Sequence, residues 1–369
     1  MVTTMHNTGT PRFTAAVALL LLGMALLPAH SLFAAVIIQY HHVDDSTPAI
    51  TSVTRQQFAE HMQYLADNDF NVMHLPEMMR ALKNKQRLPD RAIAITFDDG
   101  YRSVLTNAVP LLRKHGFPYT IFINTELTGN SHEFISWKQL HQLNREGATI
   151  ANHTTVHSHL VRQQDDESYL QWQQRIENEI MQAESKIRQQ LGKSPGLLAY
   201  PYGEYNNLIK IISKTHGLIG FAQHSGAFDE NVDWQAVPRF AFNQMYADME
   251  GFTDKVNSLP MPLRSTIARD HRGEPLDEPL IPLHSHRPTL KLSLESAELA
   301  SRVQCFASGQ GRVPSDIDGA TVTLHLQQDL PVGRSRINCT APSDQAGRFH
   351  WYSHFFMRKT EENEWYEEP

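Results

Sequence analysis

Two carboxylates stand side by side directly after the most apolar segment of the chain. The segment AIAITF (92–97) is typical of a buried strand, and Asp98 and Asp99 follow it. Adjacent carboxylates at a strand end are costly unless a cation or a proton-transfer role compensates. Neighbouring side chains point in different directions, so one acid can bind a metal while the other faces a substrate. An ordinary turn at Asp99-Gly100 is the alternative interpretation.

Two histidines follow at a spacing of four residues. The segment HTTVH places His153 and His157 on one face of a helical turn, where both can bind one metal ion. With one carboxylate they form a ligand set that leaves positions open for water and substrate. That set favours Zn²⁺, with Fe²⁺, Co²⁺ or Mn²⁺ as alternatives. The chain has 20 histidines, so such a pair also arises by chance, and nearby His159 has the wrong spacing for that face.

Two further strand ends carry polar residues. The segment YHHV places His41 and His42 after the first strand, where either can act as a general acid, or simply cap or pack. In YPYGEYN, Pro201 presets a turn, and the Tyr202 backbone N–H can face a developing oxyanion. Taken alone, this second segment is only an aromatic turn.

Strand-like and helix-like segments alternate from residue 36 to about residue 245. Such alternation is typical of a parallel α/β architecture, either a barrel or an open sheet. In a (β/α) barrel the carboxyl ends of the strands share one face, so we expect the polar segments to converge there. The strand-like segments are 36–40, 70–75, 92–97, 118–124, 148–152, 197–201, 218–222 and 236–242.

The pattern changes after residue 262. Prolines are frequent up to residue 288, and we interpret 263–288 as a linker between a barrel domain, 36–262, and a second domain, 289–369. In the second domain apolar and polar residues alternate with a period of two, which predicts a small all-β sandwich. Its last residues, 361–369, form an acidic tail.

The chain has only two cysteines, Cys305 and Cys339, and both lie in the expected β domain. In an exported chain such a pair predicts one disulfide. A two-cysteine zinc site is the weaker alternative, because no CxxC motif or nearby histidine pair supports it.

The N-terminus predicts export. Residues 13–29 are apolar, Arg12 precedes them, and the small residues Ala34 and Ala35 follow. The stretch is shorter than the roughly 20 residues that span a bilayer. It fits a signal peptide over residues 1–35, with an uncleaved anchor as the alternative. We therefore expect a periplasmic or secreted protein with no stable membrane span after cleavage.

Composition narrows the class of protein. The chain has 369 residues, of which 41% are hydrophobic and 20% charged, as expected for about two packed domains. Lys plus Arg number 33 and Asp plus Glu 40, which gives a net charge of −7. This balance, with no run of basic residues, argues against a nucleic-acid partner.

The motifs TFDDG, HTTVH and PYG, in this order, resemble the polysaccharide deacetylase family, carbohydrate esterase family 4. The resemblance covers roughly residues 36–245. The YHHV start and the YPYGEY run are most similar to the exported branch that acts on poly-β-1,6-N-acetylglucosamine. The resemblance implies a distorted (β/α)₇ barrel and a metal-dependent hydrolase of acetamide groups, whose partner is an N-acetylglucosamine-containing polysaccharide.

The resemblance also implies roles for individual residues. Asp98 matches the catalytic base, and the Tyr202 main chain matches the group that helps to hold the oxyanion. Asp99, His153 and His157 match the ligands of a divalent metal. His41 takes the role of the acid that protonates the leaving amine.

Two positions depart from the family pattern. Many members carry an arginine two residues before the proline of the third motif, where this chain has Ala199. Arg239, in the late segment VPRF, is our candidate to pair with Asp98 instead, with a surface ion pair as the alternative. Many members also take their acid from a late Leu-x-His motif, which corresponds here to His284. We prefer His41 because the branch with an early Tyr-His motif uses that histidine.

Three further residues are candidate substrate contacts. Trp234 follows Asp233 where the family often has an Asp-Trp pair, so Asp233 is a candidate for support. Trp137 and Pro201 complete the predicted set of contacts.

Two other functions fit the same residues. One keeps the site but acts on peptidoglycan, chitin oligomers or a small amide, a choice that fold analogy does not make. The other is a non-catalytic carbohydrate-binding protein, in which Trp351 and Tyr352 of the β domain bind sugar. The complete set of acids and histidines argues against the second, and Ala199 keeps it open. The sequence names no protein partner for the C-terminal domain.

Overall fold

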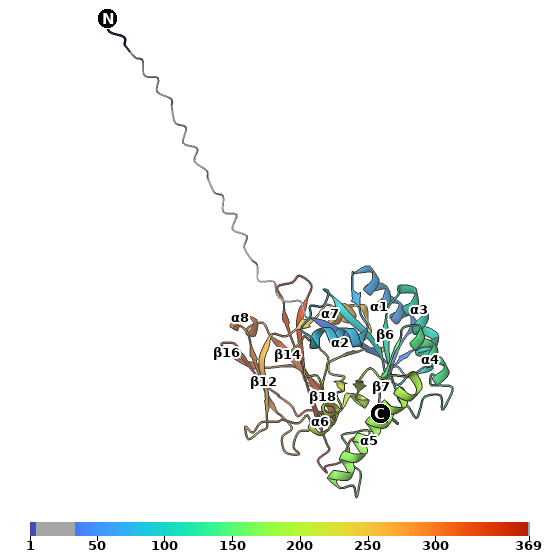
Figure 1. Ribbon diagram of the computed structural model, residues 1–369. Helices are drawn as coiled ribbons and strands as arrows, with labels where there is room; N and C mark the ends of the chain where they lie inside the picture. Colours follow the sequence, from blue (N-terminus) through green and yellow to red (C-terminus); the bar gives the residue numbers. More distant parts are fainter. Residues whose placement is uncertain (5–33, 368–369) are drawn as a thin grey trace. The chain divides into compact units, whose positions relative to one another are not determined.

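The computed structural model describes residues 1–4 and 34–367 (Figure 1). The predicted signal peptide, 1–35, lies almost wholly outside the described residues. From residue 34 onward the described chain belongs to one compact unit, which holds both the barrel and the β sandwich. Within the described part, every helix is too short or too polar to cross a membrane.

Parallel strands form the sheet of the first domain. Their order is β10-β1-β5-β6-β7-β8-β9, and β4 pairs with the start of β5. The α/β barrel that the sequence predicts is confirmed by this sheet. The strands are β1 (Ala35–Tyr40), β4 (Asn71–Val72), β5 (Ala92–Phe97), β6 (Tyr119–Ile123), β7 (Thr149–Asn152), β8 (Leu197–Ala199), β9 (Ile219–Phe221) and β10 (Phe240–Ala241).

One segment connects the two edges of this sheet. Val237 forms a parallel bridge with Phe221 of β9, and Phe240 pairs with Ile38 of β1. The expected strand over 236–242 is therefore a short β10 preceded by an isolated bridge. Pro238 lies between the two pairings and has no N–H to donate, which accounts for the interruption.

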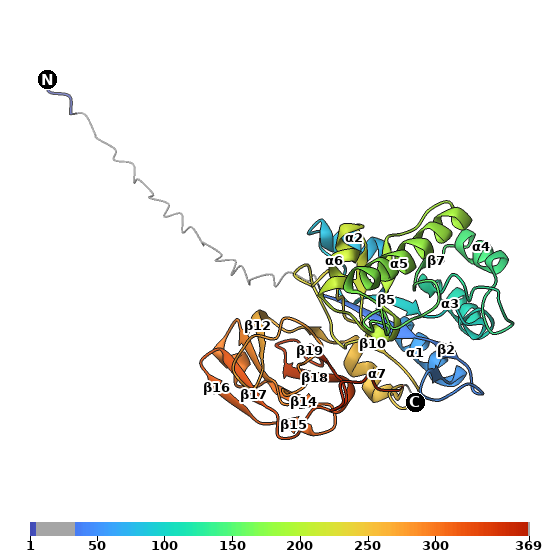
Figure 2. The same cartoon turned by 90° about the horizontal axis from the view of Figure 1, so that it is seen from below.

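Helices flank the barrel sheet (Figures 1 and 2). Thr54, Ser136 and Ser168 each begin a helix with a capping box, in which side chains satisfy the first free N–H groups. A π-helical turn over Val104–Ala108 leads into α3. The helices are α1 (Arg55–Asp67), α2 (Leu75–Lys83), α3 (Val109–His115), α4 (Trp137–Arg145), α5 (Tyr169–Leu191), α6 (Asn207–Thr215) and α7 (Met249–Val256).

Two sheets, antiparallel apart from one short parallel edge strand, form the predicted sandwich (Figure 2). Alternate residues of both sheets, such as Leu292 on β13 and Ile337 on β18, share one hydrophobic cluster. One sheet contains β11 (Leu259–Pro260), β19 (Phe349–Arg358), β18 (Gly333–Pro342), β14 (Gln304–Ala307) and β15 (Gly311–Val313). The other contains β12 (Leu263–Arg269), β13 (Thr289–Leu294), β17 (Thr321–His325) and β16 (Ser315–Asp318).

The expected linker over 263–288 needs a correction. Its first part, Leu263–Arg269, is strand β12 and pairs with β13 in the sandwich. Only residues 270–288 connect the two strands without a strand of their own. The prolines lie outside LRSTIAR rather than within it, so this segment can form a strand.

The predicted disulfide is present. Cys305 and Cys339 are bonded and stand directly opposite each other on β14 and β18. Both side chains belong to the sandwich core. The bond therefore fastens two neighbouring strands inside that core.

We expect the double variant Cys305→Ser/Cys339→Ser to destabilise the sandwich by about 2–4 kcal/mol, because it frees a 34-residue chain loop in the unfolded state. Hydrogen exchange at β14 and β18 measures this loss. Strand β5 of the barrel is the internal control and should keep its protection. Unchanged protection of β14 and β18 would contradict the expectation.

Candidate active site

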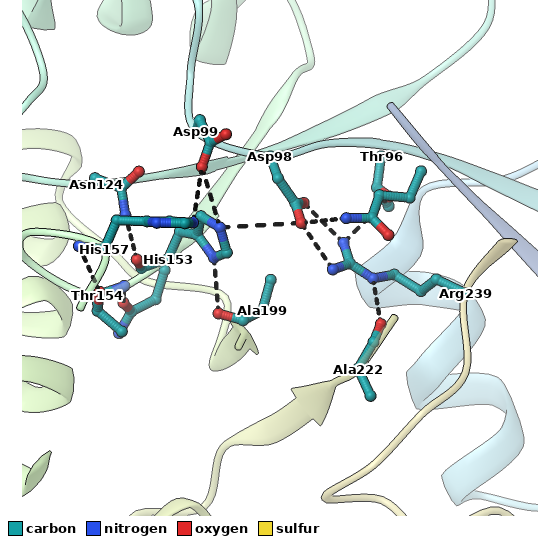
Figure 3. A network of polar contacts seen from close by, with 12 residues as sticks. Thr96, Asp98, Asp99, Asn124, His153, Thr154, His157, Ala199, Ala222 and Arg239 are labelled. Carbon is teal, nitrogen blue, oxygen red and sulfur yellow. Dashed lines mark hydrogen bonds and ion pairs between the residues drawn. The ribbon is translucent and has the colours of Figure 1, made fainter. Parts of the chain in front are cut away.

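The Asp98 carboxylate follows β5 and is fully buried. Arg239 donates to both of its oxygens, Nη1 to Oδ1 at 2.7 Å and Nη2 to Oδ2 at 2.8 Å (Figure 3). The Gln39 side chain donates a third hydrogen bond, to Oδ2, at 2.6 Å. Burial raises the pKa of Asp98, but the charge and hydrogen bonds of Arg239 help to outweigh it, and the pKa lies below its ordinary value. Asp98 is therefore an ionised carboxylate in a fixed position.

Arg239 pairs with Asp98, as the sequence analysis predicted. Its side chain is fully buried, and Nε donates to the Ala222 carbonyl at 2.9 Å. A surface ion pair, the alternative interpretation, is thereby excluded. Ala199 stands at the position of the usual family arginine. Its backbone carbonyl oxygen accepts a hydrogen bond from His153.

Asp99 turns away from Asp98 and faces the two histidines. Its Oδ1 lies 3.2 Å from Nε2 of His153 and 3.3 Å from Nε2 of His157 (Figure 3). Burial raises the pKa of Asp99, but the charges of the two histidines help to outweigh it, and the pKa falls well below its usual value. Its φ of 69° lies in the left-handed region, which turns this carboxylate away from its neighbour.

His153 follows β7 and is completely buried. Its Nδ1 lies 2.8 Å from the Ala199 carbonyl oxygen, which can only accept, so Nδ1 carries the proton. In the neutral ring Nε2 then presents a lone pair toward Asp99. Burial lowers the pKa of His153, but the charges of Asp98 and Asp99 outweigh it and raise the pKa. The two carboxylates thus draw positive charge to this point.

The three side chains fit a divalent metal ion. Their ligand atoms all lie within 4.8 Å of one another. Two ligands about 2.1 Å from one ion, at octahedral to tetrahedral angles, lie roughly 3.0–3.4 Å apart, as Asp99 Oδ1 does from each histidine. In the described part of the chain, Asp99 Oδ1 and His153 Nε2 are buried and have no hydrogen-bond donor. A cation would satisfy both atoms.

The expected helical turn at HTTVH is wrong. Residues 153–157 form a loop after β7, and Thr154 and His157 both have left-handed backbone angles, with φ of 69° and 63°. The Thr154 N–H donates to Asn152 Oδ1 at 2.7 Å, and the His157 N–H donates to Thr154 Oγ1 at 3.2 Å. These local bonds replace the helical ladder. The spacing identified the right pair of histidines, but a strained loop brings them together.

Tyr202 lies beside this histidine pair. Its ring is 4.5 Å from that of His157, in an edge-on arrangement. It belongs to the short turn Pro201–Gly203, which follows β8, and its φ is 59°. Pro201, the first residue of this turn, is buried. The structure thus brings the third predicted motif next to the first two.

The two histidines after β1 have different surroundings. His42 stacks on Tyr101 at 3.7 Å and lies 3.2 Å from Ser103 Oγ. The charge of His41 is among the causes that lower the pKa values of Asp98 and Asp99. The acid role of His41 stays a prediction from the family resemblance.

Four other predicted residues lie elsewhere. Trp137 begins α4 and packs against the hydrophobic core of the barrel. Trp234 packs against another core cluster, which holds the first residues of β1, β5 and β8. Asp233 is paired with Lys210 at 2.5 Å. His284 is exposed in the loop that leads to β13. These positions do not support a substrate contact for Trp137 or Trp234, or an acid role for His284.

Several residues of the site gave no signal in the sequence. Gln39 sits in β1 as an ordinary strand residue, yet its side chain donates a hydrogen bond to Asp98. Glu204 was visible only as part of the YPYGEYN run, yet it pairs with His159 and Arg334 just after the Tyr202 turn. Arg334 itself is one charged residue of strand β18. The three residues of this contact come from segments far apart in the chain. Only the folded structure joins them.

Comparison with known sequences points to one family. Residues 85–220 match the family model described as polysaccharide deacetylase. A poly-beta-1,6-N-acetyl-D-glucosamine N-deacetylase of Staphylococcus epidermidis is 28% identical over 215 residues, covering 55% of this chain and 74% of the relative. A protein with the same description from Staphylococcus aureus has the same identity and coverage.

Solved structures share the barrel. Streptococcus pyogenes deacetylase PplD, in complex with acetate, gives a TM-score of 0.55 at 21% identity and covers 60% of this chain and 98% of its own. IcaB from Ammonifex degensii gives 0.53 at 21% identity, covering 59% and 95%. At this identity the likeness shows the fold. The family assignment rests on the sequence match: residues 85–220, which include the two adjacent acids, the histidine pair and Tyr202, belong to a polysaccharide deacetylase domain.

Proposed function

We propose that this protein is an exported, metal-dependent N-deacetylase that removes acetyl groups from N-acetylglucosamine polymers, with poly-β-1,6-N-acetylglucosamine as the preferred substrate. The observation that supports it most strongly is the division of two adjacent carboxylates. Asp98 is held by Arg239, while Asp99 faces His153 and His157. A base and a metal-ligand set therefore lie side by side.

Asp99, His153 and His157 would hold the divalent cation, which supplies Lewis-acid polarisation of the acetamide carbonyl. Asp98 accepts the proton of the attacking water, because Arg239 keeps it ionised and its oxygens fixed. His153 holds its proton at Nδ1 on the Ala199 carbonyl, which leaves Nε2 directed at Asp99.

Two further residues complete the proposed reaction. The Tyr202 backbone N–H stabilises the negative charge that develops on the carbonyl oxygen. His41 protonates the leaving amine, and the products are acetate and a glucosamine residue. Glucosamine is cationic at neutral pH, so each turnover adds a positive charge to the polymer.

An aromatic surface next to Asp99 supports a sugar substrate. Tyr101 stacks on His42 at 3.7 Å and on Phe134 at 5.3 Å, and all three are partly exposed. Flat rings of this kind pack well against the apolar face of a pyranose. The linkage is supported by the printed descriptions of the Staphylococcus relatives. Export is supported by the apolar N-terminal stretch.

The test is acetate release by the purified chain from β-1,6- and β-1,4-linked N-acetylglucosamine oligomers, with and without chelator. We expect faster release from the β-1,6 oligomer, loss of release with chelator, and recovery when Zn²⁺ is added back. Faster release from the β-1,4 oligomer would overturn the linkage. Release from neither by metal-loaded protein would favour peptidoglycan or small-amide substrates, and absence of bound metal would favour a binding protein.

Replacing the base tests its role directly. We expect Asp98→Asn to keep the bound metal and to lower kcat by about 10²–10⁴-fold, the contribution typical of a general base. Because Arg239 loses a buried counter-charge, the free energy of unfolding should fall by about 3–5 kcal/mol. Acetate release, metal content and denaturant unfolding measure the three effects. The exposed variant Asp316→Asn is the control, and wild-type turnover in Asp98→Asn would refute the assignment.

Replacing a proposed ligand should act on metal affinity first. We expect His157→Ala to weaken metal binding at least about 100-fold, since even outer-shell partners cost about 10- to 100-fold. Competition against a chromogenic chelator measures this affinity. His325→Ala, an exposed histidine on β17, should bind metal as the wild type does. Equal affinity in the two variants would show that His157 is not a ligand.

A further inference from the structure

The turn that carries Tyr202 is fastened to the C-terminal domain through one buried carboxylate. Glu204 follows the turn, and its side chain is inaccessible to solvent. His159 Nδ1 lies 2.8 Å from Glu204 Oε2, and Arg334 Nη1 donates to Oε1 at 3.0 Å. The Tyr366 hydroxyl also donates to Oε1. Arg334 lies on β18 of the sandwich, and Tyr366 lies in the segment that follows β19.

The same residues enclose the ring of Tyr202. His159 stacks on this ring at 3.7 Å with an interplanar angle of 6°. The Arg334 guanidinium carbon lies 5.3 Å from the ring centre, and it also lies 5.5 Å from the ring of Tyr366. Tyr202 is therefore held both by its own ring contacts and through Glu204, two positions along the chain.

The backbone of this turn needs support from outside. Tyr202 and Gly203 are both left-handed, with φ of 59° and 70°. This conformation costs a tyrosine about 1–2 kcal/mol, and such residues persist only where their surroundings hold them. A Cβ on Gly203 would lie 2.7 Å from the Gln223 backbone nitrogen, so the turn packs closely against the segment that follows β9.

We propose that Arg334 and Tyr366 are positioning residues for the deacetylase reaction, and that the C-terminal sandwich is thereby part of the catalytic unit. They hold Glu204, Glu204 holds the turn, and the turn carries Tyr202, whose ring lies against His157 of the metal-ligand set. The inference rests on the proposed function for its catalytic meaning. The residues that it adds lie outside the part of the chain that matches the family model.

The energetic argument concerns a buried charge. Without Arg334 the Glu204 carboxylate loses its permanently charged partner, and an under-paired buried carboxylate is costly. The cheapest relief is a shift of Glu204 toward water, which carries the turn with it. A displacement of about 1 Å near the reacting atoms can cost 10²-fold in rate. Since the oxyanion contact forms only in the transition state, the loss belongs to kcat.

The experiment compares Arg334→Met with Arg334→Lys and with the control Arg312→Met, an exposed arginine on β15 of the same domain. We expect Arg334→Met to lower kcat about 10- to 100-fold, with KM and metal affinity within about threefold of wild type. Arg334→Lys should recover part of the lost kcat, because lysine keeps the positive charge but lacks the planar guanidinium group. Arg312→Met should match the wild type. An unchanged kcat in Arg334→Met would overturn the proposal.

A second measurement does not depend on activity. Hydrogen exchange of the segment 200–206 should be faster in Arg334→Met and in Tyr366→Phe, which removes only the hydroxyl, while β5 stays protected. If the wild type releases no acetate but exchange of 200–206 is faster in the variants, the proposed function fails and the support of the turn by Arg334 and Tyr366 stands. If the wild type is active and neither exchange nor kcat changes in either variant, the positioning role of Arg334 and Tyr366 fails and the proposed function stands. Faster exchange throughout the variants, β5 included, would show a purely structural role and would also overturn the positioning proposal.

Discussion

The ion pair between Asp98 and Arg239 is the interaction on which the rest of the site depends. It joins the end of β5 to the segment that connects β9 with β1, and both side chains are fully buried. Removing two charges from water is expensive, and the cost is offset here by two short parallel hydrogen bonds and a third from Gln39. The pair therefore fixes the Asp98 carboxylate, the proposed base, and fastens the barrel across its connecting segment at the same point.

This pair also explains why two adjacent acids can have different roles. With Asp98 committed to Arg239, the left-handed backbone of Asp99 directs the second carboxylate to the histidines. Thr154, His157 and Tyr202 share that backbone region, so strain is concentrated around the proposed metal position. Local hydrogen bonds support the loop after β7, and contacts from the sandwich support the turn at Tyr202. The rigid strands alone do not shape the site; the loops between them must be held as well.

Much of this was predictable from sequence, for physical reasons. Apolar strand segments and helix periodicity indicated the barrel, and alternation with period two indicated the sandwich. Asp98, Asp99, His153 and His157 were identifiable because metal binding and acid–base chemistry need those side chains at strand ends. The same spacing misled about geometry, since a run of five residues does not reveal that Thr154 and His157 adopt left-handed angles.

Other features depend on contacts between distant segments, which sequence patterns do not encode. Gln39 and Arg334 resemble ordinary strand residues, and only the folded chain shows what they bind. Trp137 and Trp234 drew attention as aromatic residues, but packing uses them in the barrel core. The predicted start of the linker was wrong, because frequent prolines on both sides drew attention away from the proline-free strand β12.

The central claim is that Asp99 binds the metal while Asp98 remains free of it as the base. A crystal structure of the Zn²⁺-loaded protein, with anomalous difference density measured on both sides of the zinc absorption edge, tests this directly. We predict one peak within bonding distance of Asp99 Oδ1, His153 Nε2 and His157 Nε2, with both oxygens of Asp98 still bound to Arg239. A peak ligated by Asp98, with Arg239 displaced, would contradict the account.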